Sequence, residues 1–458
     1  MTTIEKAIPN ISKSKYTAGL QCLKRQYLQI YQPQLNTQDT THVMTEGTTV
    51  GAVARRMFPH GVLVDTDNRK FDEAVARTAE LCSDPEVLAV FEAAFQYEHL
   101  RIRVDVLCRV GEGWKIGIVP DKELDYLVGE VKSSTKVKPQ HCDDISFQVY
   151  VLRKLGMTVV DSVIVILNAD YVYNGGVHNL TKLFKLEVVR PKPDAEIDGE
   201  LHKQFSALAQ PAPPEISCGS QCKSPHVCEF LDHCRPYVPG STPNEMGMAA
   251  AKPLHYPLHF LDFETVVAAI PIFSGTKPWA QVPIQWSCRN SSGPDAEMEH
   301  LEFLHDDDSD PRRAFADSLY AAIGNTGSVI TYSHFEKTVL RKLAEEFPEY
   351  KERFRQVESR IWDLYTDGVK RIFTIDDPAF NGSLSIKNVV RALIPTLRYD
   401  TLTIKSGDDA MKAWQELIQM PAGPERTKLR HDLSEYCGMD TLAMVGILGK
   451  LRSKIIIN

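Results

Sequence analysis

The amino-acid sequence predicts an α/β protein with two domains, and three observations lead to this prediction. The chain has 458 residues, which exceeds the length of about 250–300 residues at which a single hydrophobic core stops growing. Short segments with the alternation of strands occur between longer segments with helical periodicity. Residues 236–254 are rich in Pro, Gly and Ser, as linkers are. We therefore expect domains at residues 1–240 and 241–458.

The first domain is expected to combine strands and helices. Residues 101–108 alternate polar and apolar side chains as a half-buried strand does, and residues 158–167 contain many β-branched residues. The expected strands are residues 101–108, 126–132 and 158–167. The expected helices are residues 14–30, which include Cys22, 45–58 and 143–155.

The second domain is expected to open with a strand at residues 259–264, where apolar and acidic side chains alternate. A short strand at residues 329–332 leads into a helix that begins near residue 334. Further helices are expected at residues 385–393 and 431–451. Because strands and helices occur in both halves, both domains are expected to be α/β.

Composition and charge limit the classes of function. Hydrophobic residues make up 43% of the chain and charged residues 24%, as in soluble globular proteins. No apolar run approaches the roughly 20 residues of a membrane span, and residues 1–6 lack an apolar signal core. We therefore expect a cytoplasmic protein without a membrane partner. The formal net charge of −8 argues against tight, non-specific coating of DNA.

The first group of candidate site residues lies in the first domain. Glu130 and Lys132 are two residues apart on an expected strand, so their side chains face the same side. Asp105, on a neighbouring strand, can converge on them. Two carboxylates can bind Mg²⁺ or Mn²⁺, which prefer oxygen ligands, and a nearby lysine can stabilise charge on a phosphate.

Residues 128–153, which include Gln148 on the following helix, resemble RecB-like nucleases of the PD-(D/E)XK superfamily. This resemblance implies that Asp105 and Glu130 hold the metal, that Lys132 is catalytic and that Gln148 lies beside the site. Two points depart from the family. The rival acids Asp121, Glu123 and Asp125 precede Glu130. Many members also have a metal-binding His on an N-terminal helix, where this chain offers Glu46 as a possible substitute.

The cysteines indicate a bound metal or cluster. Ten cysteines in a cytoplasmic chain are not expected to form disulfides, and the four at positions 218, 222, 228 and 234 lie within 17 residues. Cys22 together with Cys222, Cys228 and Cys234 resembles the iron–sulfur staple of AddB-type and CRISPR-associated RecB-like exonucleases. That resemblance implies a [4Fe–4S] cluster on four thiolates. Two alternatives stay open: Cys218 in place of Cys22, and Zn²⁺ with His226 or His233 as reserve ligands.

The second group of candidate site residues lies in the second domain. Asp262 and Glu264 share one face of a strand, and Tyr436 and Asp440 share one face of a helix. The pattern resembles DEDD-type 3′–5′ exonucleases of the RNase H-like fold, in their tyrosine variant. The resemblance implies two metal ions held by Asp262, Glu264 and Asp440, with Tyr436 positioning the attacking water.

The middle acid of this second pattern has two candidates. Glu336 lies in the segment where the family carries this acid, and Asp363 is its main rival. The nearby segment 382–387, which ends at Lys387, also has two interpretations. It is either a phosphate-contacting loop at the start of a helix or an ordinary N-cap formed by Ser383 or Ser385.

Over most of its length the chain resembles a bacterial family that joins a RecB-like nuclease half to an RNase H-like half. This resemblance implies a metal-dependent nuclease, an exodeoxyribonuclease by preference, that acts on single-stranded DNA and 3′ ends. DNA is expected over RNA as the partner, with a role in DNA repair or in defence against foreign DNA. Two alternatives remain: a nucleic-acid-binding scaffold in which one or both sites are inactive, and a redox sensor in which the cluster gates DNA binding.

Overall fold

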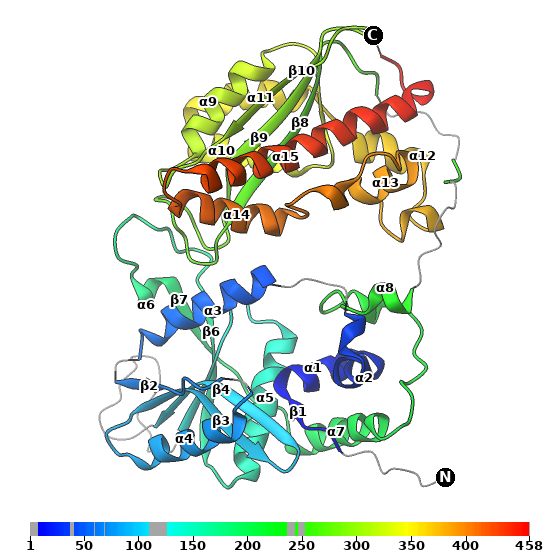
Figure 1. Ribbon diagram of the computed structural model, residues 1–458. Helices are drawn as coiled ribbons and strands as arrows, with labels where there is room; N and C mark the ends of the chain where they lie inside the picture. The colour runs from blue at the N-terminus through cyan, green and yellow to red at the C-terminus, as the bar shows by residue number, and fades with distance from the viewer. Residues whose placement is uncertain are drawn as a thin grey trace. The chain divides into compact units, whose positions relative to one another are not determined.

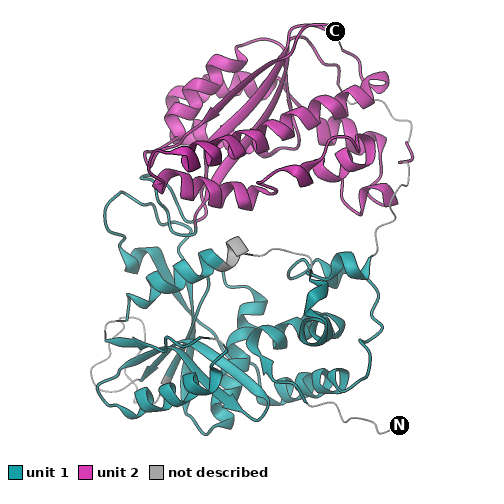
Figure 2. Cartoon of the chain, viewed as in Figure 1, with its two compact units in different colours: residues 1–236, 269–278 teal, residues 237–268, 279–458 magenta. Residues whose placement is uncertain are grey.

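A computed structural model describes residues 8–36, 41–58, 60–67, 69–109, 126–235, 243–245 and 252–457. The chain divides into two compact units (Figure 2). Unit 1 comprises residues 1–236 and 269–278, and unit 2 comprises residues 237–268 and 279–458. Each unit contains a β-sheet with helices packed on it, so the expected α/β class is confirmed (Figure 1). None of the described helices is both long and apolar enough to cross a membrane.

The sheet of unit 1 has the strand order β2-β3-β4-β5-β6-β7, with β1 beside β4. Its strands are β1 (Ile11–Ser12), β2 (Gly61–Leu63), β3 (Ala89–Tyr97), β4 (Leu100–Arg109), β5 (Tyr126–Val131), β6 (Val159–Leu167) and β7 (Phe184–Val188). β4 and β5 are antiparallel, whereas β5 and β6 are parallel and are connected through α5 (Pro139–Lys154). Val106 pairs with Gly129, which brings Asp105 and Glu130 onto adjacent strands.

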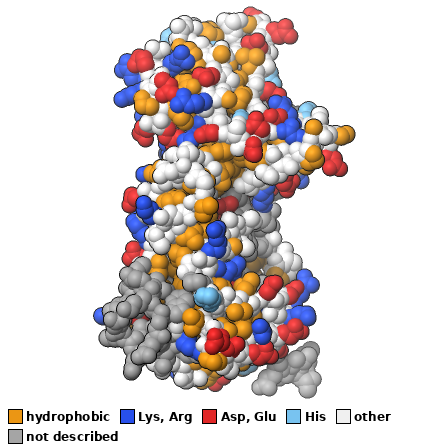
Figure 3. All heavy atoms as spheres, turned by 90° about the vertical axis from the view of Figure 1, so that its left-hand side faces the viewer, with side chains coloured by type: hydrophobic (Ala, Val, Ile, Leu, Met, Phe, Trp, Pro, Cys, Tyr) orange, Lys and Arg blue, Asp and Glu red, His pale blue; other side chains and the backbone are white. Residues whose placement is uncertain are grey.

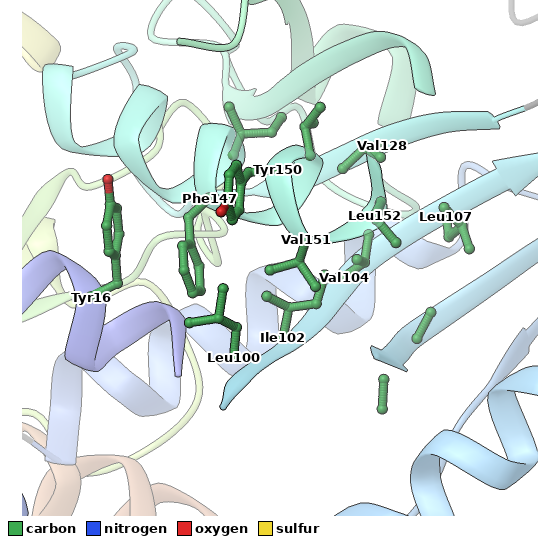
Figure 4. Close-up of a cluster of buried hydrophobic side chains, with 14 of the residues drawn as sticks. Tyr16, Leu100, Ile102, Val104, Leu107, Val128, Phe147, Tyr150, Val151 and Leu152 are labelled. Carbon is green, nitrogen blue, oxygen red and sulfur yellow. The ribbon is translucent and has the colours of Figure 1, made fainter. Parts of the chain in front are cut away.

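The helices of unit 1 pack on this sheet around a buried apolar core. They are α1 (Lys13–Gln21), α2 (Leu23–Tyr31), α3 (Thr41–Arg55), α4 (Phe71–Ser83), α5, α6 (Leu180–Leu183), α7 (Asp194–Leu208) and α8 (Leu231–Cys234). Figure 4 shows part of the core, where α5 places Phe147 and Val151 over Val104 and Ile102 of β4. The Phe147 ring stacks on Tyr16 of α1, with centroids 4.5 Å apart, so α1 and α5 are held side by side.

The single helix expected at residues 14–30 is wrong, because the chain breaks at Cys22. Cys22 has extended backbone angles of φ −166° and ψ 120°, so it ends α1 and begins α2. Its N–H still donates to the carbonyl of Ala18, and its carbonyl accepts from Gln26. The helical hydrogen bonds therefore continue on both sides of the break while the chain changes direction. Apolar periodicity does not register such a break, since both helices bury residues.

The sheet of unit 2 has the strand order β10-β9-β8-β11-β12. Its strands are β8 (Leu258–Val267), β9 (Gln281–Ser291), β10 (Glu299–Leu304), β11 (Ser328–Thr331) and β12 (Ile361–Asp363). Its helices are α9 (Arg312–Ile323), α10 (Phe335–Glu346), α11 (Lys351–Ser359), α12 (Lys370–Ile372), α13 (Ile386–Leu393), α14 (Gly407–Gln419) and α15 (Pro424–Leu451). β8, β9 and β10 are antiparallel, whereas β11 runs parallel to both β8 and β12.

The central strand β8 has an apolar core on each of its two faces. Phe260 packs with Met444 and other buried side chains of the α15 side, whereas Leu261 and Phe263 pack in the core that contains α9 and α10. Because alternate residues of a strand face opposite sides, Asp262 and Glu264 follow Phe260 toward α15. The long helix α15, which carries Asp440, runs across the sheet that contains β8 (Figure 1). The two acidic residues of β8 therefore lie on the strand face that this helix covers.

The strands expected at 101–108, 126–132, 158–167, 259–264 and 329–332 are confirmed within a few residues. The helices expected near 45–58, 143–155, 334 onward, 385–393 and 431–451 are also confirmed. α5 and α15 begin earlier than expected, at Pro139 and Pro424. Proline fits the first turn of a helix because that turn needs no backbone donor, so each proline starts its helix instead of preceding it.

The Phe147→Ala substitution should lower the free energy of unfolding of unit 1 by about 3–5 kcal/mol, because Phe147 is fully buried and truncation leaves a cavity. The reactivity of the buried Cys108 thiol, followed by mass spectrometry across a urea series, reports this unit. The matched control is Val177→Ala, since Val177 is 85% exposed in the same unit. Equal shifts of the urea midpoint for both variants would contradict the packing described here.

Candidate active sites

Three carboxylates converge in unit 2. Asp262 and Glu264 come from β8 and Asp440 comes from α15, and each offers an oxygen within 4.8 Å of the others. In the described part of the chain this is the one group of at least three His, Cys, Asp or Glu residues with ligand atoms so close together. Oxygen donors at this spacing suit a hard divalent cation such as Mg²⁺ or Mn²⁺.

Neighbouring side chains fix the orientation of these carboxylates. The Tyr399 hydroxyl donates to Asp440 Oδ1 at 2.5 Å, and the Cys437 thiol lies 3.6 Å from Asp262 Oδ2. Both contacts involve groups that are at least partly buried, so the carboxylates have few alternative positions. Their remaining oxygens are left for a ligand within the cluster.

The charge of the cluster is not balanced by a paired cation. In the described residues, none of the three carboxylates forms an ion pair with Lys or Arg. Burial and the neighbouring Asp440 raise the pKa of Glu264 to about 8. Burial, Asp440 and Glu264 raise the pKa of Asp262, and burial also raises that of Asp440. A bound cation would relieve this repulsion, so the donor set fits a metal ion.

Glu336, the preferred middle acid, is a buried carboxylate whose pKa responds to the charges of this cluster. It lies in the first turn of α10, is 2% exposed and has an Oε2 atom without a hydrogen-bond partner in the described structure. Burial raises its pKa most, and the charges of Asp363, Asp440 and Glu264 raise it further. The rival Asp363 instead uses Oδ1 to accept from the backbone N–H groups of Ser333 and Tyr365, each at 2.9 Å. The choice between Glu336 and Asp363 as the middle acid therefore stays a prediction.

Tyr436 and Lys387 complete the surroundings of the cluster. Tyr436 is 4% exposed and lies one turn before Asp440 on α15. The Lys387 ammonium donates to the carbonyl of Lys405 at 2.5 Å and lies 3.4 Å from the Tyr436 hydroxyl. Its charge lowers the pKa of Glu264 and Asp440, against the larger effect of burial. Lys387 is a site residue that the sequence indicated only as the end of a loop.

The N-cap interpretation of residues 382–387 is confirmed for the position of Ser385, but the expected capping hydrogen bond from a serine side chain is not formed. Ser385 occupies the N-cap of α13, but its side chain makes no capping bond. Ser383 Oγ instead accepts from the backbone N–H of Ser385 at 3.2 Å. The loop is therefore closed by a local turn before α13 begins.

Unit 1 brings together all four of its expected site residues around Glu130, which is 1% exposed. Glu130 accepts from Lys132 at 2.8 Å and from the Gln148 amide at 2.7 Å. Asp105 accepts from the backbone N–H of Val131 at 2.8 Å. The β4–β5 pairing and the position of α5 behind β5 create this arrangement.

Two residues of this site were missed by sequence reasoning. Lys13, the first residue of α1, donates to both oxygens of Glu130, at 2.6 and 2.8 Å, and lies 3.7 Å from Asp105. Asp144 of α5 pairs with Lys132. Asp144 stands four residues before Gln148, so helical spacing could have indicated it. Lys13 is too distant in sequence for any local signal.

The two lysines set the protonation of the carboxylates. Burial alone would raise the pKa of Glu130, but Lys13 and Lys132 together lower it to about 2. Burial and the charge of Glu130 raise the pKa of Asp105 to about 7. The Lys13 ammonium therefore occupies a position between two carboxylates that favours a cation, which is consistent with a metal ion competing for the same place.

Glu46, the possible substitute for the missing His, has a different partner. Its Oε2 accepts from the backbone N–H of Ala269 at 2.7 Å, within the 269–278 segment of unit 1. One of its oxygens is therefore committed to the backbone. The rival acids Asp121, Glu123 and Asp125 lie outside the described residues.

Five cysteines line one small cavity in unit 1. They are Cys22, Cys218, Cys222, Cys228 and Cys234. Cys22 comes from the break between α1 and α2, and the apolar side chains of Leu28 and Phe230 pack beside it. Burial raises the pKa of Cys228 to about 11 and also raises that of Cys218 and Cys234. Lys24 and Arg25 also line the cavity, and their charges lower the pKa of Cys234 and Cys228, respectively, against the larger effect of burial.

The structure leaves the ligand alternatives of the cysteine site open. Among the described residues, no three of these sulfur atoms lie within 4.8 Å of one another. His226 and His233 are absent from the described lining of the cavity. Cys22 and Cys218 both line it, so the choice between them stays open.

Two comparisons with known proteins give relatives of this chain. A family model described as a domain of unknown function, DUF2779, matches residues 259–385. The matched range contains the acids of β8, Glu336 and Asp363, and it ends before Lys387. The uncharacterized protein MG366 of Mycoplasma genitalium is 25% identical over 211 residues, which cover 41% of this chain and 31% of that protein. Neither description names an activity.

The stability of unit 2 should fall as the pH rises from about 4.5 to 8 in the presence of EDTA. Glu264 has an ordinary pKa of 4.5 and a folded pKa of about 8, so in this range the folded state holds a proton that the unfolded chain has released. Such a group lowers stability by up to about 1.4 kcal/mol per pH unit.

Thermal unfolding followed by tryptophan fluorescence measures this effect, since four of the five tryptophans belong to unit 2. Mn²⁺ should reduce the slope because it stabilises the ionised carboxylates, and Glu264→Gln should reduce it without metal. A melting temperature that rises with pH over this range would refute the assignment.

Proposed function

We propose that this protein is a metal-dependent nuclease with two active sites, one in each unit. The observation that carries the proposal is the convergence of Asp262, Glu264 and Asp440 from β8 and α15. Their unbalanced charge and the adjacent Tyr436 support a site that holds a divalent cation. Phosphodiester hydrolysis is the reaction that such a carboxylate cluster serves in proteins that bind nucleic acids.

In unit 2, Asp262, Glu264 and Asp440 would hold Mg²⁺ or Mn²⁺, with Glu336 as the fourth acid. When bound, the cation would lower the pKa of a coordinated water and stabilise negative charge on the phosphate. The Tyr436 hydroxyl, 3.4 Å from the Lys387 ammonium, would orient the attacking water. Tyr399 would keep Asp440 in its ligand orientation through the hydrogen bond at 2.5 Å.

In unit 1, Asp105 and Glu130 would hold the cation in the place that the Lys13 ammonium occupies. Lys132 would stabilise charge on the scissile phosphate, and Asp144, its partner, would keep its ammonium directed toward the site. Gln148 would hold Glu130 in position through the amide hydrogen bond at 2.7 Å. The contacts of Lys132 with Asp144 and of Gln148 with Glu130 support these proposed roles.

The finer fold assignments are part of this proposal. The antiparallel β4–β5 pair followed by α5 and parallel β6 supports a RecB-like PD-(D/E)XK nuclease fold for unit 1. Three antiparallel strands continued by two parallel strands, with α15 across them, support an RNase H-like fold of the DEDD class for unit 2. Single-stranded DNA and 3′ ends remain the proposed substrates, with RNA as an alternative.

We further propose that unit 1 binds a [4Fe–4S] cluster through Cys222, Cys228, Cys234 and Cys22, with Cys218 as the alternative to Cys22. The cavity that all five cysteines line supports this assignment. The cluster would be structural, because it would join the α1–α2 break to the segment that ends at α8. These two segments are about 200 residues apart in sequence.

Cleavage of end-labelled single- and double-stranded DNA and RNA with Mg²⁺, Mn²⁺ or EDTA tests the nuclease proposal. Lys132→Ala and Asp440→Asn should each remove a different subset of the metal-dependent products, by about 100-fold or more, since each site loses a group that stabilises charge. Lys351→Ala, an exposed change on α11, is the control. An absence of metal-dependent products in the wild type would leave a binding scaffold as the better description.

Protein purified without air should contain about four iron atoms per chain and absorb near 400 nm, as [4Fe–4S] proteins do. Cys228→Ser should abolish most of the bound iron because this buried residue lines the cavity. Cys142→Ser on α5 is the matched control, since Cys142 is absent from the lining. Stoichiometric zinc without iron would overturn the cluster assignment.

A further inference from the structure

A basic cleft lies beside the acidic cluster of unit 2. It has a volume of about 520 Å³, within the range of about 300–1,000 Å³ that is usual for ligand sites. The lining residues are Lys387, Arg391, Pro395, Leu397, Arg398, Tyr399, Asp400 and Lys405. They come from α13, the turn that follows it and the segment before α14. One of them, Tyr399, also contacts Asp440 of the acidic cluster.

The charge of this cleft is opposite to that of the chain. Four of its lining side chains are cationic and one, Asp400, is acidic, whereas the whole protein has a net charge of −8. Arg398 is paired with Asp400 at 2.5 Å, so the one acid of the lining is matched by one of its four cations. Among the side chains coloured in Figure 3, cations and acids are mixed. Cations therefore outnumber acids in the lining of the cleft, although the chain as a whole is acidic.

Two side chains connect the cleft to the proposed reaction site. Tyr399 lines the cleft and donates its hydroxyl to Asp440. Lys387 lines the cleft and contacts Tyr436, with its ammonium above the rings of Tyr399 and Tyr436 at 5.4 and 5.2 Å. A nucleic-acid strand whose end lies at the carboxylates could therefore continue directly into the neighbouring cleft.

The apolar side chains of the lining also suit a nucleic-acid strand, because they can contact its sugars or bases. Leu397 and Pro395 lie among the cationic residues, so the cleft combines surfaces for sugars or bases with groups for phosphates. Exposed lysine and arginine side chains along one path are the usual way in which proteins follow a single strand. A compact anion such as inorganic phosphate would use only part of this path.

We propose that this cleft binds the phosphodiester backbone of the single strand whose end lies at the Asp262–Glu264–Asp440 cluster. The inference rests on the proposed nuclease function and deepens it, because it identifies where the uncleaved part of the substrate is held. Arg391 and Lys405 are exposed contacts for phosphates of this strand. They act on substrate affinity, whereas the carboxylates act on the reaction.

Binding is measured separately from cleavage. The protein carries Asp440→Asn, the buffer contains EDTA, and the probe is a fluorescent 12-nucleotide single-stranded DNA followed by anisotropy across a salt series. Arg391→Ala combined with Lys405→Ala should weaken binding and reduce the slope of log K against log salt by about 1.4, since each lost phosphate contact contributes about 0.7. Lys351→Ala combined with Arg355→Ala on α11 is the matched control and should leave the slope unchanged.

Steady-state cleavage by the same double variant in the otherwise unmodified protein supplies a second measurement. KM should rise while kcat at saturating strand stays within twofold, because neither residue contacts the carboxylate cluster. An unchanged salt slope, or a loss confined to kcat, overturns the proposal. So does equal competition by a nucleoside 5′-monophosphate or inorganic phosphate, which would make the cleft a site for small anions. Normal cleft-dependent binding without any metal-dependent cleavage would instead refute the nuclease function.

Discussion

The repulsion among three buried carboxylates is the constraint on which unit 2 depends. Asp262, Glu264 and Asp440 lie close enough to share one ligand, and burial raises the pKa of each. Such an arrangement is unfavourable by itself, so the surrounding fold must enforce it. β8 is central in the sheet with apolar cores on both faces, and α15 is anchored by buried residues along its length. The stability of these cores holds the acids together.

Unit 1 meets the same difficulty by a different arrangement. Its most buried carboxylate, Glu130, is surrounded by donors: two ammonium groups and an amide. These donors offset the desolvation of the charge, so the pKa of Glu130 is held at about 2 instead of being raised. Asp105 keeps a raised pKa beside it. Glu130 is therefore ionised at neutral pH, whereas Asp105, in the same site, has a pKa of about 7 and loses its proton near neutral pH.

Sequence periodicity could predict the elements and the local pairs, and it could not predict long-range partners. Glu130 with Lys132 and Tyr436 with Asp440 are fixed by strand and helix spacing, which is a property of the local backbone. Lys13 reaches Glu130 across 117 residues and Lys387 reaches Tyr436 across 49. Such contacts depend on how elements pack. The break at Cys22 escaped prediction for a related reason, since a single extended residue leaves the apolar pattern intact.

The two lysines give the two proposed cation sites different electrostatic surroundings. The Lys13 ammonium lies directly on Glu130, so a divalent cation there must displace a cation that already balances the charge. The Lys387 ammonium is held by the carbonyl of Lys405 and by Tyr436, at a distance from the carboxylates that leaves their charge unbalanced. Lys387 still lowers the pKa of Glu264 and Asp440, so a cation entering unit 2 would gain the attraction of the cluster reduced by the repulsion of this ammonium. In unit 1 a cation would gain only the difference from the Lys13 ammonium, which contacts both oxygens of Glu130.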